Sequence, residues 1–139
     1  MRLIIYTDGA SRGNPGKASY GFLIKGSSGE ILYSEGKFLG IATNNFAEYS
    51  AVLSAYEYIK QKWDGKITEL NFFMDSKLVV EQLSGRFRVK SENLKPLIYE
   101  IKKNESLFSR VAYKHVPRRL NSEADAIANK ALDNLNYQV

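Results

Sequence analysis

The chain has 139 residues, 44% of them hydrophobic and 25% charged, which is the composition of a globular domain with its own buried core. It has no cysteine, which excludes disulfides and thiolate metal sites, and no apolar run near the ~20 residues that span a bilayer. The net charge of +5 is uneven, because residues 77–119 contain eleven Lys and Arg against four Glu. This segment is either a solvated surface or a footprint for a polyanion such as nucleic acid. We expect a cytoplasmic protein with no membrane association.

A run of strands comes first and then gives way to alternating helices and strands. Residues 2–7 are expected to form a strand, followed by strands at 19–25 and 30–38 around a glycine turn. Next come a long helix at 47–63, a strand at 69–74 and a helix at 77–83 capped by Ser76. A helix at 91–104, a strand at 110–116 and a helix at 121–135, capped by Asn121 or Ser122, complete the chain. The order predicts an α/β architecture, a mixed sheet with helices packed on it.

The glycine-rich stretch DGASRGNPG, residues 8–16, is interpreted as a turn after the first strand. It fails the P-loop pattern around Gly16, because Ser11 and Ala18 stand where Gly and Ser or Thr are required. Two interpretations stay open at this point. The turn binds phosphate through its amides, or the strand before it presents the carboxylate of Asp8 to a metal.

Four acids are directed toward one end of the predicted sheet. Asp8 ends the first strand and Asp75 ends the fourth, and ligands of α/β sheets gather outside the carboxyl ends of parallel strands. Glu48 is expected in the first turn of the long helix, on its apolar stripe, where a lone carboxylate is costly. Asp125 repeats this placement in the last helix. Each acid alone is explained by capping or by the helix dipole, but the four together predict a common site.

Carboxylates gathered in this way favour hard divalent cations, so we expect Mg²⁺ or Mn²⁺. Four carboxylates can hold two ions ~3.5–4 Å apart, the arrangement that supports in-line displacement at phosphorus. One ion activates water and the other stabilises the departing oxygen.

Four motifs in order, DGASRGNPG, TNNFAEYSAVLSA, FFMDSKLVVEQL and HVPRRLNSEADAIANKA, resemble ribonuclease H of type 1. The resemblance covers most of the chain and implies a ribonuclease H-like, five-stranded mixed sheet, three antiparallel then two parallel strands, with helices on both faces. It implies a single catalytic domain over residues 1–139, a monomer with no obligate protein partner. It also implies an endonuclease that cuts the RNA strand of RNA–DNA hybrids, with two Mg²⁺ or Mn²⁺ ions bound with substrate and 5′-phosphate and 3′-hydroxyl products. The metal-binding carboxylates it implies are Asp8, Glu48, Asp75 and Asp125.

The same motifs suggest the residues that contact the hybrid. The resemblance implies that the surface includes Gly13, Asn14, Thr43, Asn44 and Asn45. Amide side chains both donate and accept, which suits recognition of a 2′-hydroxyl. The alternative is that Asn44 or Asn45 caps the long helix. Lys77 stands where many members have Gln, so it can hold a phosphate but lacks the two-way hydrogen bonding of an amide.

Two basic segments have open roles. If residues 86–90 are extended, Arg86, Arg88 and Lys90 share one face and track DNA phosphates, with Phe87 on a sugar or on the core; the alternative is solubilising charge. His115 lies ten residues before Asp125, as a catalytic-loop His does in many members. Alignment on Val116-Pro117, however, makes the loop about four residues shorter. This predicts that Arg118, or alternatively Arg119, contacts the scissile phosphate, and that His115 is a half-buried strand residue.

Other functions fit parts of the pattern. A non-catalytic hybrid-binding module would lose at least one acid, whereas all four are present. Relaxed activity on double-stranded RNA stays open. A domain linked to a polymerase is disfavoured by the start at Met1 and the short length, and a 3′–5′ exonuclease would show an acid at Ala10.

Overall fold

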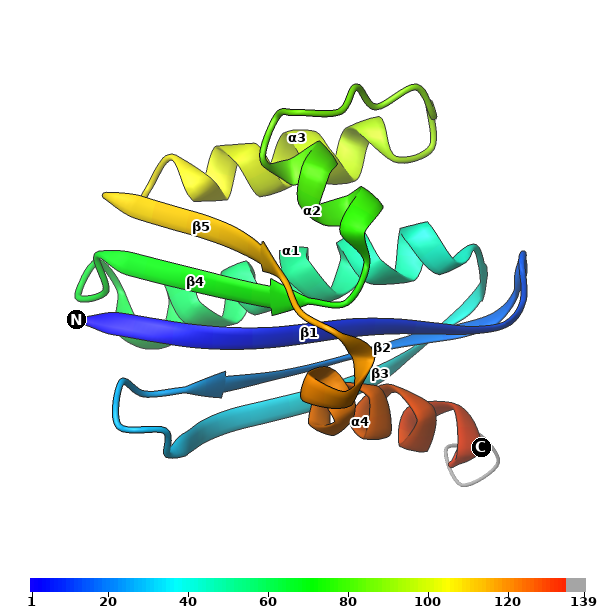
Figure 1. The fold of residues 1–139 in the computed structure, drawn as a ribbon, viewed down its shortest axis with the longest axis horizontal. Coiled ribbons are helices and arrows are strands. Elements are labelled where there is room, and N and C mark those ends of the chain that lie inside the picture. Colours follow the sequence, from blue (N-terminus) through cyan, green and yellow to red (C-terminus); the bar gives the residue numbers. More distant parts are fainter. Residues whose placement is uncertain (135–139) are drawn as a thin grey trace.

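The computed structural model describes residues 1–134 and contains a five-stranded sheet between two helical layers (Figure 1). The strand order is β3-β2-β1-β4-β5. β1 pairs antiparallel with β2 and β2 with β3, while β1 with β4 and β4 with β5 are parallel, which confirms the predicted mixed sheet. The strands are β1 (Arg2–Gly13), β2 (Gly16–Lys25), β3 (Ile31–Ala42), β4 (Glu69–Met74) and β5 (Arg110–His115).

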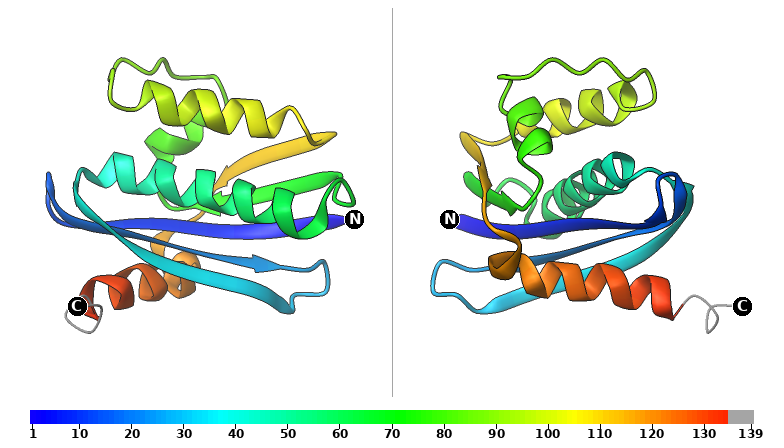
Figure 2. Two further views of the ribbon diagram at one scale, coloured as in Figure 1. Left: turned by 180° about the vertical axis from the view of Figure 1, so that it is seen from behind. Right: turned by 45° about the vertical axis from the view of Figure 1, so that its right-hand side comes forward.

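Three helices share the main core on one face, and one helix covers the other face (Figure 2). The first group is α1 (Asn44–Trp63), α2 (Lys77–Leu83) and α3 (Lys95–Glu105). On the other face, α4 (Ser122–Asp133) packs on β1, β2 and β3 after a single 3₁₀ turn, η1 (Arg118–Asn121). Residue 135, predicted as the end of this last helix, lies outside the described residues. Within residues 1–134 no helix is both long enough and apolar enough to cross a bilayer.

The core follows from the side-chain periods of the sequence. Leu3 and Ile5 of β1 alternate with half-exposed neighbours and are fully buried against α1. From α1, residues such as Val52 and Ala55 lie on the buried stripe that faces them. This packing places the start of α1 at the same end of the sheet where β4 ends.

Several predicted boundaries were wrong. β2 begins at Gly16 and not at 19, and β3 ends at Ala42 and not at 38. β1 continues to Gly13, because residues 8–13 pair with β2, so the stretch 8–16 is mostly strand and only its tip turns. α1 begins at Asn44 because the Thr43 hydroxyl accepts a hydrogen bond from the Phe46 amide at 3.1 Å. Glu48 therefore lies in the second turn. α3 begins only at Lys95, with Pro96 in its first turn, where a missing N–H costs no helical bond.

Gly9 allows α1 to approach β1 closely. A Cβ atom at Gly9 would lie 2.5 Å from the Glu48 amide nitrogen and 2.8 Å from the Ala47 Cβ. Distances this short are not tolerated by real Cβ atoms, so the contact requires glycine. The first half of α1, with Glu48, is thereby held directly against the strand that carries Asp8.

Replacing Gly9 by Ala is expected to force α1 away from β1 and to lower the free energy of unfolding by about 1–3 kcal/mol. Urea titrations followed by circular dichroism measure the change. Gly26→Ala is the matched control, since the atoms nearest to its new Cβ belong to the flexible carboxyl end of Glu30. Equal stability of the two variants would show that the α1–β1 contact accepts a methyl group.

Candidate functional site

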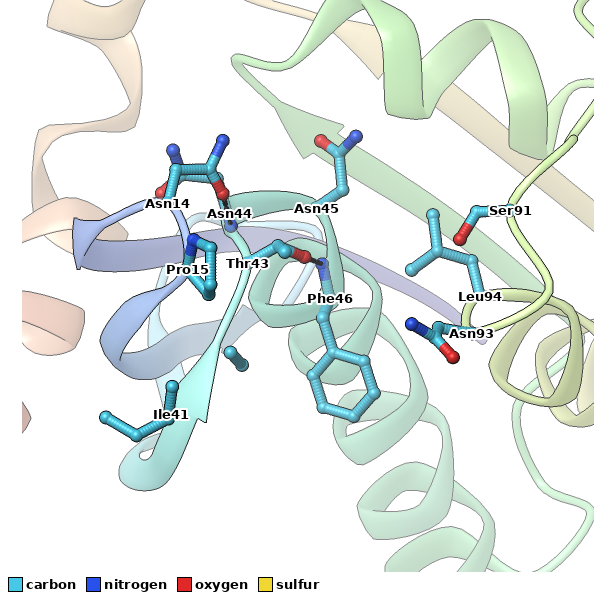
Figure 3. A pocket seen from close by; sticks show the side chains of 11 residues that line it. Asn14, Pro15, Ile41, Thr43, Asn44, Asn45, Phe46, Ser91, Asn93 and Leu94 are labelled. Carbon is cyan, nitrogen blue, oxygen red and sulfur yellow. Dashed lines mark hydrogen bonds between the residues drawn. The ribbon is translucent and has the colours of Figure 1, made fainter.

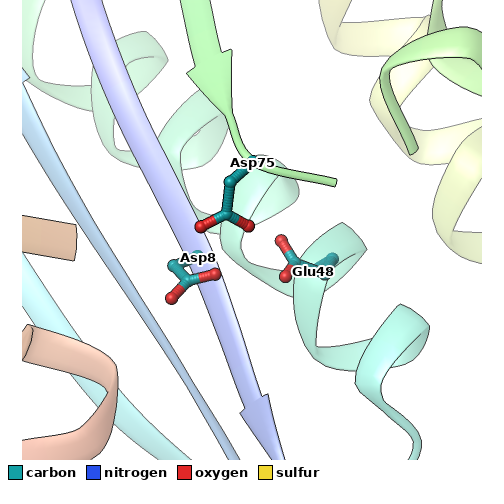
Figure 4. A group of neighbouring side chains, drawn as sticks. All are labelled: Asp8, Glu48 and Asp75. Atoms are coloured by element: carbon teal, nitrogen blue, oxygen red, sulfur yellow. The ribbon is translucent and has the colours of Figure 1, made fainter. Parts of the chain in front are cut away.

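Three carboxylates from three separate elements meet at the end of the parallel part of the sheet (Figure 4). Asp8, Glu48 and Asp75 each offer an oxygen atom, and these atoms all lie within 4.8 Å of one another. The last parallel pair of β1 and β4 is Tyr6–Phe73, so Asp8 and Asp75 each stand two residues beyond it. Asp8 does not end its strand as predicted, because β1 stays paired with β2; it stands instead where the parallel ladder ends.

The fourth predicted acid lines the same small cavity. This cavity has a volume of about 280 Å³ and is lined by all four acids together with Gly9, Asn44, Asn45, Ser76 and Arg118. Asp125 lies in the first turn of α4, half-buried and next to Asp8. Its carboxylate accepts a 3.2 Å hydrogen bond from Asn129 one turn later. The acids predicted from four distant motifs are therefore brought together in one place.

Burial of like charges dominates the electrostatics of this cavity. Burial, followed by the charges of Glu48 and Asp75, raises the pKa of Asp8 far above its ordinary value. Burial also raises the pKa of Glu48. The Oε2 atom of Glu48 is buried and has no hydrogen-bond partner among the described residues. Crowded carboxylates with an unpartnered oxygen are the donor set that a hard divalent cation requires, so these residues fit Mg²⁺ or Mn²⁺.

A groove of about 800 Å³ adjoins the acid cavity, and Asn44 and Asn45 line both (Figure 3). Gly13, with a positive φ of 106°, permits the tight turn that carries Asn14. The Oδ1 atom of Asn14 accepts a 3.1 Å hydrogen bond from the Asn44 amide, which ties this turn to the start of α1. The cap of α1 is Thr43, so the alternative capping role predicted for Asn44 or Asn45 is not seen. Within residues 1–134 their side-chain amides make no hydrogen bond and can serve a ligand.

The two candidate basic residues of the shortened loop differ in placement. Arg118 lines the acid cavity, and its charge partly opposes the burial that raises the pKa of Glu48. Arg119 does not line the cavity. His115 is exposed at the end of β5 and does not line it either, so the expected half-burial of His115 was wrong. Lys77 is exposed at the first residue of α2, two residues after Asp75.

The basic segment after α2 is not uniformly extended. Residues 86 and 87 bend, and Arg86 forms two hydrogen bonds with the Glu81 carboxylate, at 2.5 and 3.0 Å. Arg88 is exposed and has no acidic partner in residues 1–134. Phe87 is 51% exposed and therefore outside the core, while Val89 packs against the core. The charge of Arg86 is thus compensated by Glu81, whereas that of Arg88 is not compensated by any acid in residues 1–134.

Two asparagines at the acids were not identified from the sequence. Asn129 lies four residues after Asp125 on one helix face, a spacing that would have revealed it. Asn121 was predicted as a possible cap of the last helix, but its side chain makes no cap bond. It instead contacts Thr7 of β1, 114 residues earlier, and Asp75, 46 residues earlier. No local pattern indicates contacts over such separations.

The chain is similar to known proteins over most of its length. A family model described as reverse transcriptase-like matches residues 6–131. A bifunctional protein of Mycobacterium tuberculosis is 41% identical over 134 residues, 96% of this chain and 36% of that protein. The crystal structure of RNase H1 from Halobacterium salinarum has a TM-score of 0.89 and 37% identity, covering 96% of this chain and 99% of the other. LC11-RNase H1, solved in complex with an RNA/DNA hybrid, has a TM-score of 0.90 and 35% identity, covering 96% and 98%. The chain thus spans 36% of the length of the first curated relatives.

Replacing Asp8 by Asn is expected to stabilise the metal-free protein near neutral pH. Because the pKa of Asp8 is raised by folding, the native state binds more protons than the unfolded chain above the ordinary carboxyl pKa. The free energy of unfolding of the wild-type protein therefore falls as pH rises from about 5 to about 8. The variant lacks the part of this loss that comes from Asp8 and should be more stable near pH 8 by about 1 kcal/mol or more.

Urea titrations in EDTA across this pH range measure the difference. Glu92→Gln, at a side chain that is 84% exposed, is the control and should follow the wild-type curve. If the free energy of unfolding of Asp8→Asn and of the wild type changed with pH in parallel, folding would not raise the pKa of Asp8.

Proposed function

The chain belongs to the ribonuclease H family, and from this premise we propose that it is an endonuclease that hydrolyses the RNA strand of RNA–DNA hybrids. The observation that carries the proposal is the joint placement of Asp8, Glu48 and Asp75 within 4.8 Å, with Asp125 in the same cavity. The RNA/DNA hybrid bound by a protein of 35% identity and the same fold supports the substrate class.

The four carboxylates would hold two Mg²⁺ or Mn²⁺ ions when the substrate is bound. Bound ions supply activation of water and stabilisation of the leaving oxygen, which yields 5′-phosphate and 3′-hydroxyl ends. The chain itself supplies orientation: β1, α1, β4 and α4 fix the carboxylates before substrate arrives. The exposed guanidinium of Arg118 lies at the edge of the cavity, where it can contact the scissile phosphate as a fixed cation.

The asparagines give a physical basis for choosing RNA. Asn14, Asn44 and Asn45 line the groove beside the acids, and an amide can donate to and accept from a 2′-hydroxyl. A DNA strand lacks that hydroxyl. Lys77, Arg88 and Lys90 are exposed and would contact phosphates, while Arg86 is partly satisfied by Glu81. We also propose that residues 1–139 act as one catalytic domain and as a monomer; the cytoplasmic location stays a prediction.

The proposal is tested with one labelled RNA strand, annealed to DNA, annealed to RNA, or left single, in Mg²⁺, Mn²⁺ or EDTA. We expect internal cuts in the hybrid RNA that require metal. Asp75→Asn removes a metal ligand and should slow cleavage by more than about 100-fold. Mutation of residues that merely hydrogen-bond to such ligands already costs about 10–100-fold in metal affinity or activity. Equal cutting of the RNA duplex would broaden the substrate class. Tight hybrid binding without cleavage in either metal would leave a binding module.

Arg118 and Arg119 form a natural pair for a second test. Arg118→Ala is expected to lower kcat on the hybrid between about 10- and 100-fold, because it removes a cation directed at the reacting phosphate. Arg119→Ala, one residue further along and outside the cavity, should change kcat less than about twofold. Equal effects of the two substitutions would show that general positive charge, and not contact with the phosphate, is what this loop provides.

A further inference from the structure

Asn121 joins three of the elements that carry the acids. It is 1% exposed and lies at the junction of η1 and α4, four residues before Asp125. Its Nδ2 atom donates to the Thr7 carbonyl oxygen at 2.9 Å, next to Asp8 on β1. The same atom lies 3.4 Å from Oδ2 of Asp75, which follows β4. One side chain thus contacts β1 and the end of β4 while its backbone begins the helix of Asp125.

The orientation of the Asn121 amide is fixed by its neighbours. Both partners, the Thr7 carbonyl and the Asp75 carboxylate, are acceptors, so the NH₂ group must face them. The shorter bond to Thr7 anchors the nitrogen on the strand, which leaves the second N–H directed at Asp75. The opposite atom, Oδ1, is buried without a partner among residues 1–134, so the side chain is not held by its own oxygen.

Asp75 depends on this contact because, within residues 1–134, its carboxylate accepts no other hydrogen bond. It occupies a bend between β4 and α2, one residue beyond the last ladder pair of β4 with β5, and it is only half-buried. Two further carboxyl groups, those of Asp8 and Glu48, offer oxygen atoms within 4.8 Å, and they repel the Asp75 carboxylate whenever they are ionised. The N–H donor of Asn121, 3.4 Å from Oδ2, offsets that repulsion and restricts rotation of the carboxylate.

We propose that Asn121 is a positioning residue that holds the Asp75 carboxylate in the geometry required for metal binding. The inference rests on the proposed function to the extent that Asp75 is a metal ligand. Asn121 does not touch the ion or the substrate; it acts through Asp75. Residues that orient metal ligands in this way are typically worth 10–100-fold in metal affinity.

The chain offers a close control in Asn104. This asparagine is also buried, at 4% exposed, its Nδ2 donates to the Glu100 carbonyl at 2.9 Å, and its Oδ1 is likewise unpartnered in the described residues. It lies in α3 and does not line the acid cavity. Asn104→Ala therefore reproduces the loss of a buried amide without touching a metal ligand.

The experiment is a calorimetric titration of Mn²⁺ into the full chain without nucleic acid, after circular dichroism has confirmed folding. We expect Asn121→Ala to weaken Mn²⁺ binding about tenfold and Asn104→Ala to leave it within about twofold. In an Asp75→Asn background, Asn121→Ala should have almost no further effect, because the side chain through which it acts is already changed. If Asn121→Ala does not fold, Asn121→Ser, which retains a short hydrogen-bond donor, takes its place both alone and in the Asp75→Asn background.

Three results would overturn the proposal. The first is an equal loss of Mn²⁺ affinity in Asn121→Ala and Asn104→Ala. The second is a loss of Mn²⁺ affinity from Asn121→Ala that is just as large in the Asp75→Asn background. The third is no Mn²⁺ binding by the wild-type chain. The readout is metal binding and not cleavage, so the two proposals can fail separately. If the Mn²⁺ affinities follow the expected pattern but the chain does not cleave the hybrid, the role of Asn121 stands and the proposed nuclease activity fails.

Discussion

Holding several like charges in one buried cavity is the requirement on which the rest of the structure depends. Carboxylate oxygens within 4.8 Å repel one another, so flexible side chains alone would move apart. The backbone prevents this. The parallel register of β1 and β4 sets the spacing of Asp8 and Asp75, and the contact at Gly9 sets the depth of Glu48. A slip of one residue in β1 would turn Asp8 to the other face of the sheet and abolish the site.

The sequence predicted the parts of this arrangement that local rules govern. Asp75 directly follows an apolar strand, and Glu48 lies on an apolar helical stripe, so both were visible from side-chain period alone. The limits of β1 were not visible, because residues 8–13 are a strand only through pairing with β2. Thr43 was not chosen over Asn44 as the helix cap, since both residue types cap well and only the backbone decides. The contact of Asn121 with Thr7 depends on the whole topology and has no local signal.

A negatively charged cavity must still admit a polyanion, and the distribution of cations addresses this conflict. The chain carries a net charge of +5, but some of its positive groups are already used internally, as Arg86 is by Glu81. Others remain exposed near the cavity, including Arg118 at its edge and Lys77 at the start of α2. Cations at the edge attract phosphates without entering the cavity, where they would neutralise the carboxylates that an ion needs.

The need to keep the cavity negative also explains why the side chains that hydrogen-bond to the acids are neutral amides. Asn121 donates to Asp75 and Asn129 donates to Asp125, and neither carries a charge. A Lys or Arg in either position would orient the carboxylate more strongly, but it would also occupy the place of a divalent cation and remove the repulsion that favours binding it. A neutral N–H restricts rotation and leaves the negative charge in place. The cost is a metal-free protein whose buried acids are only partly satisfied, as shown by the Glu48 oxygen that has no hydrogen-bond partner in residues 1–134. Binding of ions would remove that cost, so affinity for metal and instability without it have a single physical origin.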